Sequence, residues 1–83
     1  MGAIIADMKN ELTRIKRTYL AQCAALAAAR SVPYDPSTTE TRHAARAASD
    51  AAYTKAYRAE VARVKTLSDA QVEAECLAKE IAR

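Results

Sequence analysis

Apolar positions in the first third of the chain recur at the spacing of a helix. Large apolar side chains follow steps of three and four residues, with a shift of one position near the end: Ile5, Met8, Leu12, Ile15, Tyr19, Cys23 and Leu26. We call this set the apolar stripe. Because steps of three and four place residues on one face of an α-helix, the pattern predicts a helix over residues 3–30. We expect the stripe to lie in the core.

Two prolines interrupt the helical pattern between positions 31 and 36. Proline lacks an N–H donor and restricts the residue before it, so these positions predict a loop. The next helix has two alternative starts: Asp35 as the cap with Pro36 in the first turn, or Ser37 as the cap with Glu40 three residues later. Both alternatives predict a helix over residues 36–65.

The helix over residues 36–65 has two faces that could be buried. Alanines gather on one broad side, at positions 44, 45, 47, 48, 51, 52, 56, 59 and 62. A second stripe lies almost opposite, formed by Tyr53, Tyr57, Val61 and Val64. Small side chains allow two helices to approach closely, so we expect the alanine side to receive the apolar stripe. The tyrosine side would then stay uncovered by the first helix.

A helix start is also indicated near Ser68. Ser68 and Gln71 have the spacing of a capping box, and Leu67 and Val72 that of a hydrophobic staple, which predicts a helix over residues 69–82. No glycine or proline separates this segment from the one before, so a continuous helix is the alternative. We expect this helix to bury one face and to leave Val72 and Cys76 on another; the buried face would hold Ala70, Ala74, Leu77, Ala78 and Ile81.

Together these patterns predict an all-α fold in one domain over residues 1–83: an antiparallel hairpin of two long helices, followed by a shorter C-terminal helix. The chain has no Phe or Trp, so its core is poor in large side chains. Helices with two apolar faces in such a short chain favour self-association, and we expect a homodimer.

The residues offer little for catalysis. Gly2 is the only glycine, which excludes phosphate loops and nucleophile elbows, and His43 is the only histidine. Cys23 and Cys76 lack further metal ligands, and we expect buried reduced thiols rather than a disulfide or a redox pair. We therefore expect no enzyme activity and no cofactor. The longest uncharged helical run, residues 18–29, is too short to span a bilayer, and no secretory signal is visible, so we expect a cytoplasmic protein without membrane contact.

Recognition of another protein is the function that the remaining features favour. Tyrosine and arginine are enriched among residues that dominate binding energy. The candidate partner-binding residues are Tyr34, Arg46, Asp50, Tyr53, Tyr57, Val61 and Val64. The alternative is a small nucleic-acid-binding protein that uses basic helix faces, since the net charge is +3. Its candidate contacts are Arg14, Lys16, Arg17, Arg42, Arg58 and Arg63.

One stretch of the chain resembles a known class of proteins. The run Ala52-Tyr53-Thr54-Lys55-Ala56-Tyr57-Arg58-Ala59-Glu60, followed by Ala62-Arg63-Val64, is similar to the Ala- and Tyr-rich helices of small bacteriophage accessory proteins such as anti-CRISPR inhibitors. The resemblance implies a non-enzymatic inhibitor of a host defence nucleoprotein complex, which would act by occluding a site or by bringing copies of its target together. It assigns no site residues.

Overall fold

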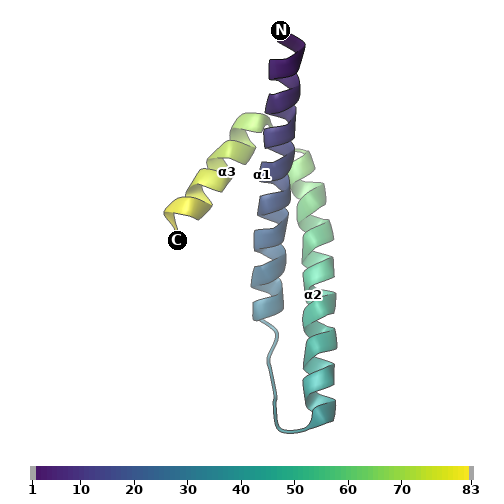
Figure 1. Cartoon of the computed structure of the whole chain (residues 1–83). Helices are drawn as coiled ribbons and strands as arrows, with labels where there is room; N and C mark the ends of the chain where they lie inside the picture. Colours follow the sequence, from purple (N-terminus) through teal and green to yellow (C-terminus); the bar gives the residue numbers. More distant parts are fainter. Residues whose placement is uncertain (1, 83) are drawn as a thin grey trace.

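The computed structural model describes the backbone of residues 2–82 and the side chains of Met8 and residues 10–82. This part of the chain forms three helices and no strand: α1 (Gly2–Arg30), α2 (Thr39–Lys65) and α3 (Asp69–Ile81). α1 and α2 lie side by side as an antiparallel hairpin, and α3 starts beside α1 and slants away from it toward the C-terminus (Figure 1). The predicted all-α fold is confirmed.

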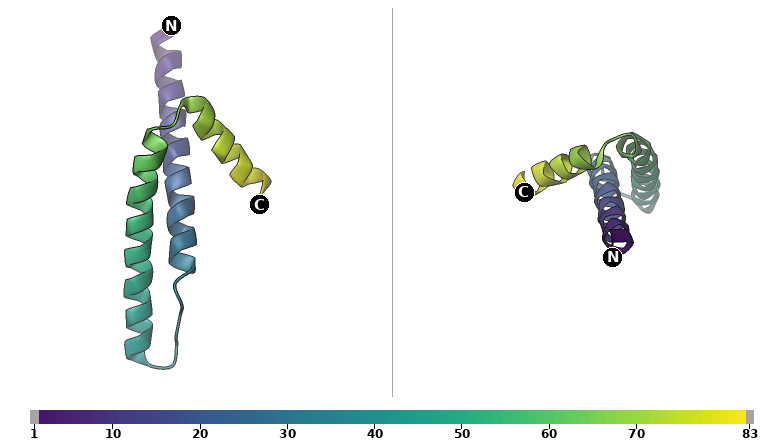
Figure 2. Two further views of the ribbon diagram at one scale, coloured as in Figure 1. Left: turned by 180° about the vertical axis from the view of Figure 1, so that it is seen from behind. Right: turned by 90° about the horizontal axis from the view of Figure 1, so that it is seen from above.

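The molecule is long and narrow, with extents of 60 × 24 × 19 Å. Viewed from above, α1 lies between α2 and α3 (Figure 2). The first turns of α1 project beyond the end of α2 and the start of α3 (Figure 1). α1 is therefore the central element, and its N-terminal turns have no neighbouring helix in the described chain.

The start of α2 differs from both predicted starts. Thr38 is the N-cap, and it forms a capping box in which Thr41 N donates to Thr38 Oγ1 at 3.1 Å and Thr38 N donates to Thr41 Oγ1 at 3.1 Å. Asp35 instead accepts a hydrogen bond from Ser37 N at 2.9 Å. The reciprocal threonine pair satisfies two of the free donors at the helix end, Thr38 N and Thr41 N, so the helix starts at Thr39 and residues 36–38 stay in the loop.

The predicted break between the second and third helices is confirmed, and a continuous helix is excluded. Gln71 N donates to Ser68 Oγ at 3.2 Å, while Ser68 N donates to Gln71 Oε1 at 2.9 Å. Leu67 packs against the core cluster that contains Val72, as a hydrophobic staple requires. The capping box thus ends one helix and starts the next without glycine or proline.

The core is small and lies where the three helices meet. Leu20 from α1, Val64 from α2, and Val72 and Cys76 from α3 form one buried cluster, with Tyr19 and Leu67 packed against it. Along the hairpin the buried positions of α1 are alanines, Ala21 and Ala25. On α2 the side chains of Ala45, Ser49, Ala52 and Ala56 are half-buried. Small side chains on both helices let the backbones approach closely.

The prediction that the apolar stripe lies in the core is wrong. Met8, Leu12 and Ile15 are 62%, 56% and 55% exposed, and Leu26 is exposed as well. Tyr19 and Cys23 are half-buried, and the side chain of Ile5 lies outside the described residues. α1 packs on α2 through the nearly opposite face, where alanines fit the narrow gap between the helices. Close backbone packing has taken precedence over burial of the large side chains.

The face that α3 buries is the reverse of the predicted one, and the face that α2 buries is shifted from it, since only Ala45, Ala52 and Ala56 of the predicted alanine side are half-buried. On α2, Ala44, Ala47, Ala48, Ala51, Ala59 and Ala62 are exposed, and the hairpin contact lies nearer the tyrosine side, with Val64 in the core. On α3, Val72 and Cys76 are buried, whereas the predicted face is exposed: Ala70, Ala74, Leu77, Ala78 and Ile81. Both differences have the same cause. α1 packs through the face nearly opposite to the apolar stripe, and this choice determines which faces of α2 and α3 it covers.

Two leucines of α1 provide a direct test of this orientation. Leu20 is fully buried and Leu12 is 56% exposed. At a protein concentration low enough for the chain to be monomeric, we expect Leu20→Ala to lower the free energy of unfolding by about 2–4 kcal/mol and Leu12→Ala by less than about 0.5 kcal/mol. Urea denaturation followed by circular dichroism measures both. A larger loss for Leu12→Ala than for Leu20→Ala would show that the stripe is the core after all.

Candidate protein-binding surfaces

The loop and the first turns of α2 form a surface at the closed end of the hairpin. We define this hairpin-end surface as Arg30, Tyr34, Arg42, His43, Arg46 and Asp50, all of which are exposed. The loop is held by hydrogen bonds on both sides of Asp35: Ser37 N donates to its carboxylate, and Thr41 Oγ1 donates to its carbonyl at 3.0 Å. Tyr34 is thus presented by an ordered loop between two prolines, and it is 67% exposed.

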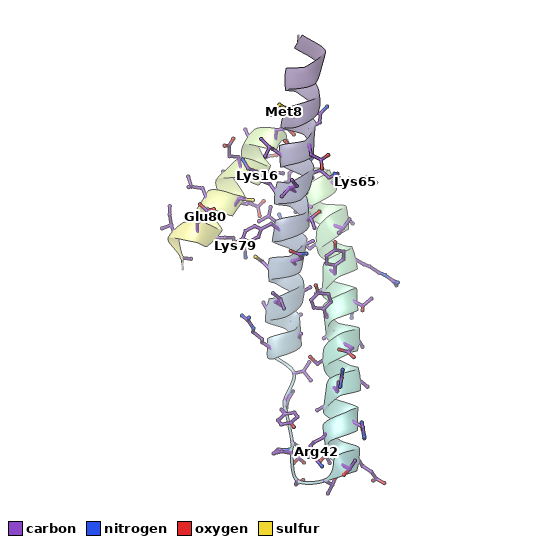
Figure 3. The ribbon with its side chains drawn as sticks, viewed as in Figure 1. Met8, Lys16, Arg42, Lys65, Lys79 and Glu80 are labelled. Atoms are coloured by element: carbon purple, nitrogen blue, oxygen red, sulfur yellow. The ribbon has the colours of Figure 1, made fainter. Side chains whose placement is uncertain are left out.

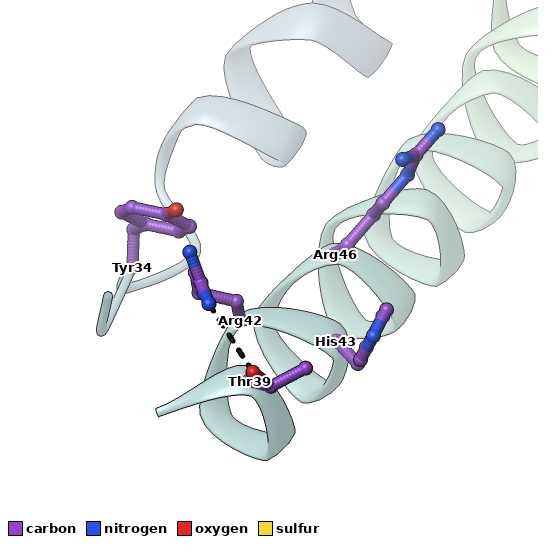
Figure 4. A pocket seen from close by; sticks show the side chains of 5 residues that line it. All are labelled: Tyr34, Thr39, Arg42, His43 and Arg46. Atoms are coloured by element: carbon purple, nitrogen blue, oxygen red, sulfur yellow. Dashed lines mark hydrogen bonds between the residues drawn. The ribbon is translucent and has the colours of Figure 1, made fainter. Parts of the chain in front are cut away.

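Two shallow hollows open beside Tyr34. One, of about 510 Å³, is lined by Tyr34, Thr39, Arg42, His43 and Arg46. In Figure 4, Arg42 extends from α2 toward Tyr34 and donates a hydrogen bond to Thr39 Oγ1 at 3.2 Å. The second hollow, of about 340 Å³, lies between the loop and α2, with Tyr34, Arg46 and Asp50 in its lining. Both hollows share Tyr34 and Arg46.

The hairpin-end surface contains three arginines, together with one carboxylate, Asp50. In the described chain, Arg30, Arg42 and Arg46 make no ion pair. The pKa of Asp35 is lowered because Ser37 donates hydrogen bonds to its carboxylate, so Asp35 is ionised at neutral pH. The arginines remain available to carboxylates or phosphates of a partner.

The other predicted partner-binding residues lie further along α2. Tyr53 and Tyr57 are half-buried and stacked, with ring centroids 6.1 Å apart and an interplanar angle of 11°. Val61 is 39% exposed, whereas Val64 belongs to the core and is no surface residue. Helix α1 thus partly covers the tyrosine side. Of the predicted partner-binding residues, Tyr34, Arg46 and Asp50 are exposed and lie toward the hairpin end.

Most of the predicted nucleic-acid contacts are engaged within the chain. Arg14 pairs with Glu11, Lys16 with Glu73 at 3.4 Å, and Arg63 with both Glu60 and Glu75. The hydrogen bonds and charge of Glu75 and Glu60 raise the pKa of Arg63 further above its usual value. Among the six candidates, Arg42 and Arg58 make no ion pair in the described chain, so little of this basic charge is free for phosphates.

Arg17 has a structural position that the sequence did not indicate. Its Nε donates to the carbonyl of Val64 at 3.2 Å, and its Nη2 donates to the carbonyl of Leu67 at 3.0 Å and to Asp69 Oδ1 at 3.4 Å. These carbonyls lie at and just beyond the C-terminus of α2, where a cation is favourable; the Val64 carbonyl also accepts a hydrogen bond from Leu67 N at 3.1 Å. Arg17 therefore ties α1 to the junction of α2 and α3.

The two cysteines are free thiols in the structure. Burial raises the pKa of the Cys76 thiol, and its Sγ lies 3.6 Å from the carbonyl of Lys16. Cys76 is thus a protonated packing residue at neutral pH. The described residues contain no group of three or more His, Cys, Asp or Glu side chains placed to hold a metal ion.

Comparison with known proteins adds no relatives. No protein-family model matches the chain, and searches of curated proteins and of solved structures found no match. In the part of the chain that the structure describes, no helix combines the length and apolar character needed to cross a bilayer.

Removing the Arg17 side chain tests its role at the junction. Hydrogen bonds from a charged group contribute about 1.5–3 kcal/mol, so we expect Arg17→Met to lower the free energy of unfolding by that amount. Arg14→Met is the matched control, because Arg14 is exposed and pairs only with Glu11 among the described residues. Equal effects of the two substitutions in urea denaturation would contradict the assignment.

The ion pair between α2 and α3 predicts a pH dependence of stability. The hydrogen bonds that Arg63 donates lower the pKa of Glu75 from 4.5. A carboxylate whose pKa is lower in the folded state stabilises the fold above its unfolded pKa and loses that contribution as the pH falls. We therefore expect the urea midpoint of the wild type to fall below about pH 5 more steeply than that of Glu75→Gln. Glu80→Gln, an exposed change on the same helix, should retain the wild-type profile; an identical profile for both variants would refute the prediction.

Proposed function

We propose that this chain is a non-enzymatic helical module that binds another protein through the hairpin-end surface. The observation that carries the proposal is Tyr34, which is 67% exposed, held between two prolines, and placed on hollows that it shares with Arg46. An exposed aromatic ring on an ordered loop adds contact area at small entropic cost, and tyrosine with arginine is the combination most enriched at binding hot spots.

The charge of this surface defines the partner's chemistry. Arg30, Arg42 and Arg46 carry no ion pair in the described chain and outnumber Asp50 on this surface, so a complementary partner would present mainly carboxylates around a pocket or groove for Tyr34. Most of the other basic candidates are neutralised by carboxylates of the chain itself. A continuous basic track, which phosphate backbones favour, is therefore not formed, and this supports a protein over a nucleic acid.

The resemblance to phage accessory proteins supports a specific form of this proposal. It implies that binding inhibits a host nucleoprotein complex by occlusion or by bringing target copies together. A compact surface at one end of a long hairpin is compatible with occlusion, because the remaining length of the hairpin would project from the bound site.

Affinity capture with matched variants tests the hairpin-end surface. Tyr34→Ala and Arg46→Ala should each reduce recovery of the same protein from lysate by about 30-fold, the equivalent of about 2 kcal/mol. Arg58→Ala, an exposed arginine on α2 outside the hairpin-end surface, should leave recovery unchanged. Quantitative mass spectrometry of the bound fraction measures all three.

Two outcomes would contradict the proposal. Equal recovery in all variants would show that the hairpin-end surface does not bind the partner. Capture of nucleic acid that falls steeply as salt is raised from about 50 to 200 mM would favour the nucleic-acid alternative.

A further inference from the structure

The apolar stripe is the largest feature of the molecule that the fold leaves unexplained. Met8, Leu12 and Ile15 are each more than half exposed, and they lie on the face of α1 turned away from α2. The stripe begins on the part of α1 that projects beyond the other helices (Figure 1). Met8 and Arg42 lie toward opposite ends of the hairpin, so the stripe is separate from the hairpin-end surface (Figure 3).

We infer that the apolar stripe is the seam of a parallel, in-register coiled coil between two copies of this chain. The stripe keeps heptad register from Ile5 to Tyr19 and returns to it at Leu26, a span of about three heptads, which is the lower limit for a coiled-coil pattern; Cys23 stands one position off, at e. The heptad positions are Ile5, Leu12, Tyr19 and Leu26 at a, with Met8, Ile15 and Gln22 at d. This inference does not depend on the proposed function, because it concerns a different surface.

The charges beside the seam favour a second copy in the parallel orientation. Glu11 stands at g and Lys16 at the following e position, so each Glu11 lies next to Lys16 of the other copy in a parallel pair. Glu11 is exposed, and Lys16 is partly exposed beside Glu73. An antiparallel pair with matched layers would instead bring Lys16 close to Lys16 of the other copy. Two complementary contacts thus replace one repulsive contact.

The polar residue within the seam favours the same arrangement. Gln22 lies at a d position and is exposed, and with Ile15 and Tyr19 it lines a shallow hollow of about 430 Å³. In a parallel pair the two Gln22 amides face each other and can exchange hydrogen bonds. In the antiparallel pair that matches Met8 with Leu26, Gln22 faces Leu12, and burial of an unpaired amide is costly.

The fold of the single chain is compatible with this seam. Leu20, Ala21 and Ala25 are buried on the other side of α1, so dimer formation leaves them in place. Tyr19 is half-buried against the core cluster, and Leu12 lines a hollow beside the start of α3, so the seam runs along the edge of the contact between α1 and α3. The same rotation of α1 that exposes the stripe therefore creates the dimer surface. Two hairpins would flank a central pair of α1 helices, each with its hairpin-end surface free.

Sedimentation equilibrium tests the seam. We expect the wild type to dimerise across concentrations from about 5 to 500 µM, since dimer formation follows mass action. Ile15→Lys should weaken the dimer at least about 100-fold, because a lysine would be buried in the seam. Its helix content by circular dichroism should stay unchanged, because Ile15 is 55% exposed in the single chain. Ile81→Lys, at an exposed apolar position on α3, is the matched control and should dimerise like the wild type. A monomeric wild type, or equal dimerisation of both variants, would overturn the inference.

Charge exchange tests the flanking contacts. Glu11→Lys and Lys16→Glu should each weaken the homodimer by about tenfold, and an equimolar mixture of the two should dimerise as the wild type does. Each substitution affects the folding of its own chain equally in the mixture and in the separate samples. A tighter dimer in the mixture therefore reports only the contacts between the two chains. A Glu11→Lys dimer as tight as the wild type would exclude the parallel arrangement.

Disulfide trapping tests the orientation itself. In the antiparallel pair, two copies of position 8 are separated by about 27 Å along the helix, whereas in the parallel pair they meet. Oxidised Met8→Cys should therefore form a covalent dimer, and so should Leu26→Cys, above the background given by Cys23 and Cys76 in the wild type. Preferential crosslinking of Met8→Cys with Leu26→Cys in a mixture would overturn the parallel seam.

Discussion

The structure depends on the junction where Leu20, Val64 and Val72 come together under the guanidinium of Arg17. This is the one place where all three helices contribute large or medium apolar side chains to a buried cluster. Arg17 lies beside this cluster and donates hydrogen bonds to the carbonyls of Val64 and Leu67, at and just beyond the end of α2. The neighbouring residues Arg17 and Leu20 of α1 thus supply a polar and an apolar contact to the same junction. Away from the junction the hairpin relies on alanines, whose burial removes little apolar surface from water.

That distribution explains why α1 exposes its larger side chains. Interhelical distance along the hairpin is set by small residues on both helices, and a leucine-rich face at the same place would force the helices apart. Leu12 and Ile15 would then gain burial, but the contacts along Ala21 and Ala25 would be lost. α1 therefore packs its alanine side on α2 and leaves the apolar stripe on the opposite side for the proposed second copy of the chain.

The sequence predicted the elements well and their faces poorly. Capping residues and prolines act locally, so the break at Ser68 and the loop after Arg30 could be located from the pattern alone. Which face of a helix is buried depends on its tertiary contacts with the other helices. Heptad spacing shows that Met8, Leu12 and Ile15 share a face, but it does not show whether that face meets the same chain or another one.

The role of Arg17 could not be found from the sequence either, because its acceptors are main-chain carbonyls about 50 residues away, which leave no trace in residue types. Of the candidate binding residues, Tyr34, Arg46 and Asp50 lie together at the hairpin end, and their role in binding stays a prediction. Val64 lies in the core, because the spacing of Tyr53, Tyr57, Val61 and Val64 does not show which of them α1 covers.

The shallow attachment of α3 has a consequence for the order in which the molecule comes apart. In the described chain its buried side chains are Val72 and Cys76, and Leu77 and Ile81, further along, are exposed. A segment with few buried contacts opens at a lower free energy than the whole fold, so we expect α3 to detach while the hairpin persists. Its detachment would expose the thiol of Cys76, which lies in the core cluster when α3 is in place. The reactivity of this one sulfur atom would then follow the opening of α3.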